Sequence, residues 1–477
     1  MLESKLIKFQ PRKLIDFLLE QNLITTFLTQ KDLEKIRLTN KENMELIFQQ
    51  KYLFNLQSAK DEGDFEKLKE FISKLNYEKT NHTLSLPAYI TDEQLKLILD
   101  QKLAKGDSTV GKSVVNLNLS HCRNLTDIGA DHLLPFANIV SLNISKCDKL
   151  DKAKFSTNMM HLDISHCRNL KGENLEQMGS LESMRVYGST SIKKFKVPES
   201  VKHLDLSMNN NSEHDIQEMI DKCRNLEYLN ISGRIVGKEL NLPKTVTSVN
   251  FSQCQNFTHS QIQNTISLCP NLENLNLSGC ELEKNLELPR SIKSLDLSGC
   301  AQLNHDQIQR MINQCPSLER INLSGCKLER GLDLPSSVKS LNIRYCNKLN
   351  HHQIQEMINQ CPNLEELDVS RCQITELTFS ESVNFKKLTI LSCETLKTLT
   401  FLEDANIDSF NINHCKQLKT INIKKNIKVN DSNITSSEDL KEMLKGLPRS
   451  IKILMAKYNP SPSLENPQID QGRAPQI

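Results

Sequence analysis

The sequence predicts an α/β solenoid, in which each coil of the chain stacks on the coil before it and contributes one short parallel strand. A frame of two apolar residues separated by one polar residue, usually with cysteine three positions after the second, recurs along most of the 477 residues. NLENLNLSGC and SIKSLDLSGC, for example, begin twenty residues apart. Copies of this kind bury their apolar side chains only against neighbouring copies, which is typical of a solenoid.

In the middle of the chain the copies alternate in spacing between 20 and 26 residues, so the unit is a double repeat of 46 residues. Because side chains alternate along a strand, the two apolar residues of each frame are expected on one buried face. Each buried aliphatic side chain stabilises the fold by roughly 1.5–3 kcal/mol, provided that the adjacent coils cover it. The first apolar residues of this series are Leu229, Val249, Leu275, Leu295, Ile321, Leu341 and Leu367.

The longer half of each double repeat predicts a helix. In LNHDQIQRMINQCPSLERI the apolar residues recur at helical spacing, and Pro316 marks the end of the helix. Asn304 is the expected N-cap, and Gln307 would complete a capping box. The shorter half, as in LERGLDLPSSVKSL, predicts an extended return. The same capping pair recurs as Thr258 with Gln261 and as Asn350 with Gln353.

This pattern resembles the leucine-rich repeat, and the resemblance covers residues 81–460. It implies a horseshoe with parallel strands on the concave face and helices or extended returns on the convex face. Cysteine in the frame, as in CRNLTDIGADHLL, is similar to the cysteine-containing subfamily that is typical of F-box proteins. The phrase at residues 288–298 is also similar to repeats of amoebal proteins and of effectors from intracellular bacteria.

The 15 cysteines all fall on the repeat, eleven in the frame and four at expected helix ends. They are predicted to be buried thiols that fill small spaces and donate weakly to the turn backbone. Paired spacings such as C-x-x-C are absent from the sequence, so no metal ligand is predicted. Glycine-rich phosphate loops and catalytic motifs are absent as well, and we expect neither a cofactor nor an enzymatic activity.

The charge balance favours neither a nucleic acid nor a membrane as partner, because the formal net charge is only +2. The sequence has no apolar run of about 18 residues. Several Asn-x-Ser sequons, Asn276-Leu-Ser among them, lie inside the strand frame, where glycans would block stacking. We therefore expect a cytosolic or nuclear protein, or one in a host cytosol if it is a bacterial effector, and disulfides are disfavoured there.

The polar position between the apolar pair is mostly Asn or Asp, and the position after the pair is mostly Ser. We expect these short side chains to form hydrogen bonds along the stack. Large residues that interrupt the pattern are candidate partner-binding residues on the concave face, because Arg and Tyr often anchor interfaces; ordinary solvated side chains are the alternative. The candidates are His161, Arg185, Tyr187, His203, Tyr228, Arg320, Arg344, Tyr345, Glu366, Arg371 and Lys387.

Residues 1–57 resemble an F-box-like helical domain, most closely in ITTFLTQKDLEKIRLTNKENMELI. The usual Leu-Pro opening and the final Trp of the family are absent, and a helical cap for the solenoid is the alternative. Residues 58–80 would form a helical linker or cap, and residues 461–477 a disordered tail. The resemblance implies docking on the Skp adaptor of a cullin–RING ubiquitin ligase through Leu19, Leu23, Ile24, Phe27, Leu28, Asp32 and Leu33.

The expected function is that of a protein–protein interaction module, monomeric outside its complex. The F-box resemblance implies the substrate-recognition subunit of a Skp–cullin–F-box ligase, which binds its target through the repeat surface. Such a subunit does no bond chemistry and instead raises the effective concentration of a target lysine. The alternative is a freestanding scaffold, or a secreted bacterial effector that binds a host protein without assembling a ligase.

Overall fold

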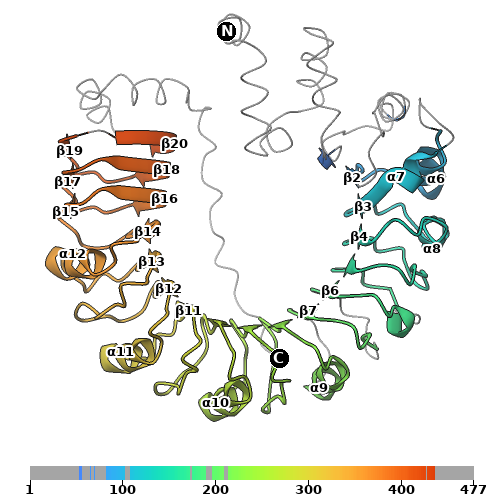
Figure 1. The fold of residues 1–477 in the computed structure, drawn as a ribbon, viewed down its shortest axis with the longest axis horizontal. Coiled ribbons are helices and arrows are strands. Elements are labelled where there is room, and N and C mark those ends of the chain that lie inside the picture. The colour runs from blue at the N-terminus through green and yellow to red at the C-terminus, as the bar shows by residue number, and fades with distance from the viewer. Residues whose placement is uncertain are drawn as a thin grey trace, which may run out of the picture. The chain divides into compact units, whose positions relative to one another are not determined.

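The computed structural model shows two compact units of stacked coils (Figure 1). The first extends to Leu303 and includes Arg310–Ser317, and the second comprises Asn304–Gln309 and the chain from Leu318 onward. Helix α11 (His305–Asn313) contributes residues to both. The structure describes residues 53–55, 65, 69, 82–102, 108–171, 175–189, 196–208, 213–425 and 427–435.

In the first unit, each coil contributes one short strand to a parallel sheet. Neighbouring strands pair frame to frame, so that Leu275 lies opposite both Val249 and Leu295. The register predicted from the repeat is therefore confirmed. The strands are β1 (Leu53–Asn55), β2 (His82–Ser85), β3 (Val114–Asn118), β4 (Ser141–Asn143), β5 (His161–Asp163), β6 (Ser183–Arg185), β7 (His203–Asp205), β8 (Tyr228–Asn230), β9 (Ser248–Asn250), β10 (Asn274–Asn276) and β11 (Ser294–Asp296).

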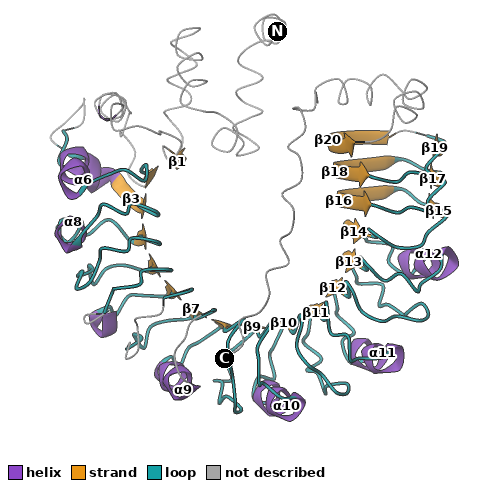
Figure 2. Cartoon of the chain, turned by 180° about the vertical axis from the view of Figure 1, so that it is seen from behind, coloured by secondary structure: helices purple, strands orange, loops and turns teal. Residues whose placement is uncertain are grey.

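The helices of the first unit lie on the side of the coils opposite the strands (Figure 2). None of the helices in the described ranges is long and apolar enough to cross a membrane. The helical elements are α6 (Asp92–Leu99), α7 (Val110–Ser113), α8 (Asp127–Asp131), the 3-10 turn η3 (Leu175–Gln177), α9 (Glu213–Lys222) and α10 (His259–Ser267).

The second unit begins with the same type of coil and then changes. Strands β12 (Arg320–Asn322), β13 (Ser340–Asn342) and β14 (Glu366–Asp368) continue the short-strand pattern, with α12 (His351–Asn359) on the opposite side. After them the strands lengthen and a second, three-stranded parallel sheet takes the place of the helices. The long strands are β16 (Val383–Leu391), β18 (Ala405–Asn413) and β20 (Ile427–Thr435), and the second sheet is β15 (Glu376–Phe379), β17 (Thr398–Phe401) and β19 (Thr420–Ile423).

The sequence analysis did not predict this second sheet, although the sequence carries a signal for it. ELTF, TLTF and TINI begin 22 residues apart, at Glu376, Thr398 and Thr420. Apolar and polar residues alternate in each, as expected for a strand. Phe379 and Phe401 stack at a centroid distance of 5.1 Å, so aromatic packing holds these coils together where others use a helix.

The core is built from the paired apolar residues of the frames. From Leu84 and Leu86 to Phe410 and Ile412, both residues of each frame are buried, and most are no more than 2% exposed. Because each pair is covered by the pairs of the adjacent coils, the core runs along the stack within each unit. The weak frame at Leu454 lies outside the described residues.

The helices begin where the sequence predicts. In α10 the Thr258 hydroxyl accepts the Gln261 N–H and the Gln261 side chain accepts the Thr258 N–H, so the predicted capping box is confirmed. The predicted boxes at residues 304 and 350 are also present.

On each of the helices α9 to α12, which we term the main helices, one glutamine side chain forms hydrogen bonds to the backbone of the extended return in the next coil. Gln309 donates to the Asp333 carbonyl at 2.9 Å and accepts the Asp333 N–H at 2.8 Å. The side-chain amide thus replaces a backbone strand partner, because it offers one donor and one acceptor to the same residue. Gln217, Gln263 and Gln355 make the same double contact with Asn241, Glu287 and Thr378.

Candidate protein-binding surface

Each strand ends in a tight turn that exposes one residue of the frame, the residue before the motif cysteine. This turn position has a positive φ, for example 69° at Gly299 and 63° at Tyr345. Glycine adopts that conformation without strain, whereas other residues pay a conformational cost of about 1–2 kcal/mol. The non-glycine residues at this position are His121, Lys146, His166, Met208, Gln253, Tyr345, Arg371, Ser392 and His414.

The Asn and Asp residues between the apolar pair stabilise that turn. The Asn276 side-chain oxygen accepts the N–H of Ser278 at 2.9 Å, a bond within one coil. The expectation that these side chains would bond along the stack is wrong for most of the Asn and Asp residues, because their oxygens are used by their own turns. The same bond is made by Asn118, Asn143, Asp163, Asp205, Asn230, Asn250, Asp296, Asn322, Asn342 and Asp368. The expectation is confirmed at one pair of serines, where the Ser298 hydroxyl donates to the Ser278 hydroxyl of the preceding coil at 2.9 Å.

The motif cysteines connect consecutive coils. Cys300 donates its S–H to the Leu277 carbonyl of the preceding coil at 3.1 Å, and Cys372 makes the equivalent bond to Ile343 at 3.1 Å. Burial raises the pKa of Cys372 to about 12. All fifteen cysteines lie in the described ranges and are buried thiols, as predicted, and no disulfide joins any of them.

Two non-cysteine residues show that this position requires a donor. Ser189 donates its hydroxyl to the Ile164 carbonyl at 3.0 Å, and Arg234 donates through Nη1 to the Leu206 carbonyl at 3.1 Å. Arg234 is only 1% exposed, so its guanidinium lies inside the stack and is not available to a partner.

On the first unit, five predicted residues come together on strands β5 to β8. Arg185 lies between Asp163 and Asp205, with both ion-pair distances 3.9 Å, and is 61% exposed. Tyr187 contacts His166 edge to face at 4.7 Å, which fixes the ring over the turn.

The rest of the first-unit cluster flanks Arg185. His161 and His203 are exposed and occupy equivalent positions on strands either side of β6. Tyr228 packs 6.4 Å from His203 and is half-buried. Burial raises the pKa of Tyr228, and the nearby Asp205 raises it further.

On the second unit, Arg344, Tyr345 and Arg371 form a cluster that we term the cationic site. The Arg344 guanidinium lies 5.0 Å and the Arg371 guanidinium 4.8 Å from the centroid of the Tyr345 ring. Both distances are in the range of cation–π contacts. Tyr345 is 42% exposed and Arg371 is exposed, while Arg344 is half-buried.

A shallow hollow of about 420 Å³ adjoins the cationic site. Sequence analysis singled out two of its lining residues, Tyr345 and Arg371, and missed the rest. Most of these follow a motif cysteine by one or two positions, so their place in the frame is the signal that could have found them. The missed lining residues are Asn347, Cys372, Gln373, Ser392, Glu394 and Thr395.

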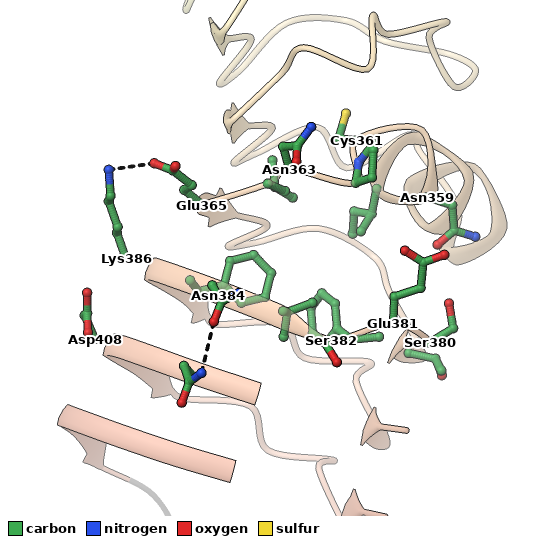
Figure 3. A pocket seen from close by; sticks show the side chains of 18 residues that line it. Asn359, Cys361, Asn363, Glu365, Ser380, Glu381, Ser382, Asn384, Lys386 and Asp408 are labelled. Atoms are coloured by element: carbon green, nitrogen blue, oxygen red, sulfur yellow. Dashed lines mark hydrogen bonds and ion pairs between the residues drawn. The ribbon is translucent and has the colours of Figure 1, made fainter. Parts of the chain in front are cut away.

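A larger hollow of about 660 Å³ lies where the coil of α12 meets the first all-strand coil (Figure 3). Its floor includes the buried rings of Phe379 and Phe385. At its edge Lys386 pairs with Glu365 at 2.7 Å, and Asn406 donates to Asn384 at 3.0 Å. Because these polar groups already bond one another, this hollow has a weaker claim to a ligand than the cationic site.

The remaining predicted residues lie on the strands of the second unit. Arg320 is exposed and lies 3.9 Å from Glu319. The Glu366 carboxylate accepts the Ser340 hydroxyl at 2.9 Å, and Lys387 is its partner in the register of the next strand. These residues occupy a different position of the repeat from those of the cationic site: they precede the apolar pair, whereas the cationic-site residues follow it.

Two expectations concern features away from this surface. The adaptor-binding residues predicted between Leu19 and Leu33 lie outside the described residues. Among the residues that the structure does describe, no group of three or more His, Cys, Asp or Glu side chains could hold a metal ion.

The sequence was compared with family models and with curated proteins, and the fold with solved structures. Leucine-rich-repeat family models match residues 360–376 and 271–295. A search of curated proteins by sequence gives no match. Among solved structures, the chain is similar to YopM, a leucine-rich effector protein from Yersinia pestis, at 16% identity and a TM-score of 0.38, covering 71% of this chain and 90% of that one.

Two further structures show similarity of the same kind. The functional domain of InlJ from Listeria monocytogenes, described as including a cysteine ladder, is 18% identical with a TM-score of 0.32, covering 72% of this chain and 70% of that one. LegL7 from Legionella pneumophila, a leucine-rich repeat-containing protein, is 14% identical with a TM-score of 0.30, covering 68% of this chain and 90% of that one.

The shared frame, its buried apolar pairs and the two family matches make this chain a leucine-rich-repeat protein. Proteins of this class are interaction modules, in which the coil is a scaffold and the exposed positions of the frame vary. In this chain most of the predicted Arg and Tyr residues lie in one cluster on each unit: around Arg185, and at the cationic site.

Proposed function

We propose that this protein binds a partner protein through the strand side of its coils and carries out no bond chemistry of its own. The observation that supports this is the contrast along the frame. At the position directly after the apolar pair most coils present Ser, as at Ser278 and Ser298, whereas one cluster presents Tyr187 there and the other presents Arg344. Large planar and cationic side chains held by a rigid scaffold are the usual anchors of protein interfaces.

The test is affinity capture with the full chain, followed by reconstitution with the purified partner. The double variant Arg185→Ala, Tyr187→Ala should bind the partner about tenfold or more weakly, because both anchors are lost. Circular dichroism should show that the variant stays folded, since Arg185 is exposed and Tyr187 is half-buried. Unchanged affinity would remove these two residues from the interface.

At a finer level, we propose that the protein is the substrate receptor of a Skp–cullin–F-box ubiquitin ligase. The support is the F-box resemblance of residues 24–47, followed by the repeat type that is common in F-box proteins. Full-length protein mixed with a Skp adaptor should elute as one complex in size-exclusion chromatography. Leu28→Glu with Leu33→Glu should abolish that complex, because charged side chains would face an apolar interface.

Failure of the wild-type chain to form the adaptor complex, while it still binds its partner, would favour the alternative function. The protein would then be a freestanding scaffold, or a secreted effector that acts in a host cell without a ligase. For a ligase subunit or a freestanding scaffold we propose a cytosolic or nuclear location. For a bacterial effector we propose the cytosol of the host cell. Because the thiols are buried, the cells should be quenched with acid and the protein alkylated under denaturing conditions; mass spectrometry should then find the thiols reduced.

A further inference from the structure

We infer that the cationic site of Arg344, Tyr345 and Arg371 binds a carboxylate-rich segment of a protein partner. The inference rests on the proposed function and specifies the chemistry of one contact. Its first support is charge. Two guanidinium groups lie within 5.0 Å of one ring, and the described residues place no carboxylate in an ion pair with either of them.

Several other basic residues of the second unit do form ion pairs with carboxylates. Lys348 pairs with Glu329 at 3.0 Å and Lys339 with Glu319 at 3.2 Å, and Arg330 pairs with Asp306. Two adjacent positive charges without such partners repel one another, and an incoming carboxylate would remove that cost. Within the described residues, Arg344 Nε is also buried without a hydrogen-bond partner. The site is therefore short of acceptors.

The backbone gives a second, independent support. Tyr345 and Arg371 have φ values of 63° and 58°, at the turn position where Gly279, Gly299 and Gly325 relieve the same strain. A tyrosine and an arginine in this conformation cost stability that glycine would not cost. Seven other coils also place a non-glycine residue at this position, so these two turns are distinguished by the contact between their arginine and tyrosine side chains.

The shape of the site favours a peptide over an enclosed small molecule. The adjoining hollow of about 420 Å³ is shallow and lies along the surface. Ser392 and Asn347 offer hydroxyl and amide groups to a peptide backbone, whereas the Thr395 hydroxyl already donates to the Ile374 carbonyl at 2.8 Å. Glu394 is the acidic residue among the lining residues. A bound carboxylate would therefore lie at the arginines, with uncharged residues of the peptide toward Glu394.

Arginine is suited to this role because its guanidinium bonds a carboxylate through two parallel N–H groups. Stacking on Tyr345 orients the two guanidinium planes before the ligand arrives, so less rotamer freedom is lost on binding. Neither a nucleic acid nor a membrane is favoured, because two positive charges in one place make no extended basic surface.

The experiment is fluorescence anisotropy with the full chain and a labelled peptide of alternating Glu and Gly, at low and high salt. The wild-type protein should bind it about tenfold more tightly than the matched Gln–Gly peptide. Arg344→Gln with Arg371→Gln should remove that preference, and Arg371→Lys should give an intermediate loss, because charge is kept without the planar fork.

The matched control is Arg330→Gln with Lys425→Gln, which removes two exposed, ion-paired charges of the same unit. It should change the affinity less than twofold. Equal binding of the two peptides, or an equal loss in the control, would overturn the inference. Tighter binding of a phosphoserine peptide that depends on both arginines would overturn the carboxylate assignment in favour of phosphate.

The outcome is separable from that of the proposed function. If the captured partner binds the Arg344→Gln, Arg371→Gln variant normally and the Glu–Gly peptide does not bind the wild type, the inference fails and the proposed function stands. If no partner binds the wild type, the proposed function fails whatever the peptide does. Circular dichroism of the variant establishes that it is folded, and the salt dependence of the wild type tests the inference without any substitution.

Discussion

At the scale of single residues, the frame divides its positions between core, turn and surface. The apolar pair packs in the core, and the side chain of the Asn or Asp accepts a hydrogen bond that closes the turn. The residue before the cysteine adopts a positive φ, and the cysteine donates a hydrogen bond to the preceding coil. Three of these tasks, namely the packing, the turn closure and the thiol bond, tolerate little change. Exposed side chains at the turn position are therefore free to diverge at a cost in backbone strain.

The turn position can be tested at Gly299, where an added Cβ would meet its nearest atoms at 3.8 Å and therefore finds room. Gly299→Ala should lower the free energy of unfolding by about 1 kcal/mol, because the φ of 69° is strained for alanine. Gly299→Asn should cost less, since asparagine tolerates that conformation. Urea denaturation measures both, and equal stability of wild type and Ala variant would contradict the strain argument.

The coil-to-coil thiol bond can be tested at Cys300. Cys300→Ala should lower the free energy of unfolding by about 1–3 kcal/mol, because a buried carbonyl loses its donor and a small cavity remains. Cys300→Ser should restore part of that loss, as Ser189 already fills the equivalent role. A serine variant less stable than the alanine variant would show that packing outweighs the hydrogen bond.

The cysteines also predict a dependence of stability on pH. Burial raises the pKa of Cys372 to about 12, above the usual value of about 8.5 in an unfolded chain. The unfolded state therefore loses protons first, and stability falls as the pH rises from about 9 toward 12. Chemical denaturation across that range should show the fall, with a shallower slope for Cys372→Ala; equal slopes would contradict this account.

At the scale of elements, glutamine on each main helix substitutes for a strand partner. Gln309→Ala should lower the free energy of unfolding by about 1–2 kcal/mol, because two hydrogen bonds to Asp333 are lost. Gln309→Glu keeps the acceptor but loses the donor, so it should also destabilise the protein. The matched control is Gln373→Ala, an exposed glutamine outside any helix or strand, whose effect on thermal unfolding should be negligible.

The change from helical to all-strand coils is the main feature that the sequence analysis missed at this scale. Helix-forming segments such as HDQIQRMIN carry an apolar stripe and a cap, and were recognised by periodicity. Segments such as TLTF are short and alternate over only four residues. Their pairing in a second sheet depends on long-range contacts that a local pattern does not encode.

At the scale of the whole molecule, each coil contacts mainly its neighbours, so stability should be local. Hydrogen exchange of Cys300→Ala should show lost protection in the coils next to β11 and little change at β4 and β5. Uniform loss of protection across the first unit would indicate all-or-none cooperativity instead.

The sequence by itself determined the repeat, the register of the strands, the buried thiols, the helix caps and the identity of the residues that interrupt the frame. These follow from local periodicity, because one coil repeats the geometry of the last. Only the tertiary structure decided which interruptions matter. It placed Arg185 at the surface between two carboxylates, buried Arg234, and gathered Arg344 and Arg371 around one tyrosine ring. The reason is that charge pairing and burial depend on side chains from different coils. The residue spacing within one coil does not specify those contacts.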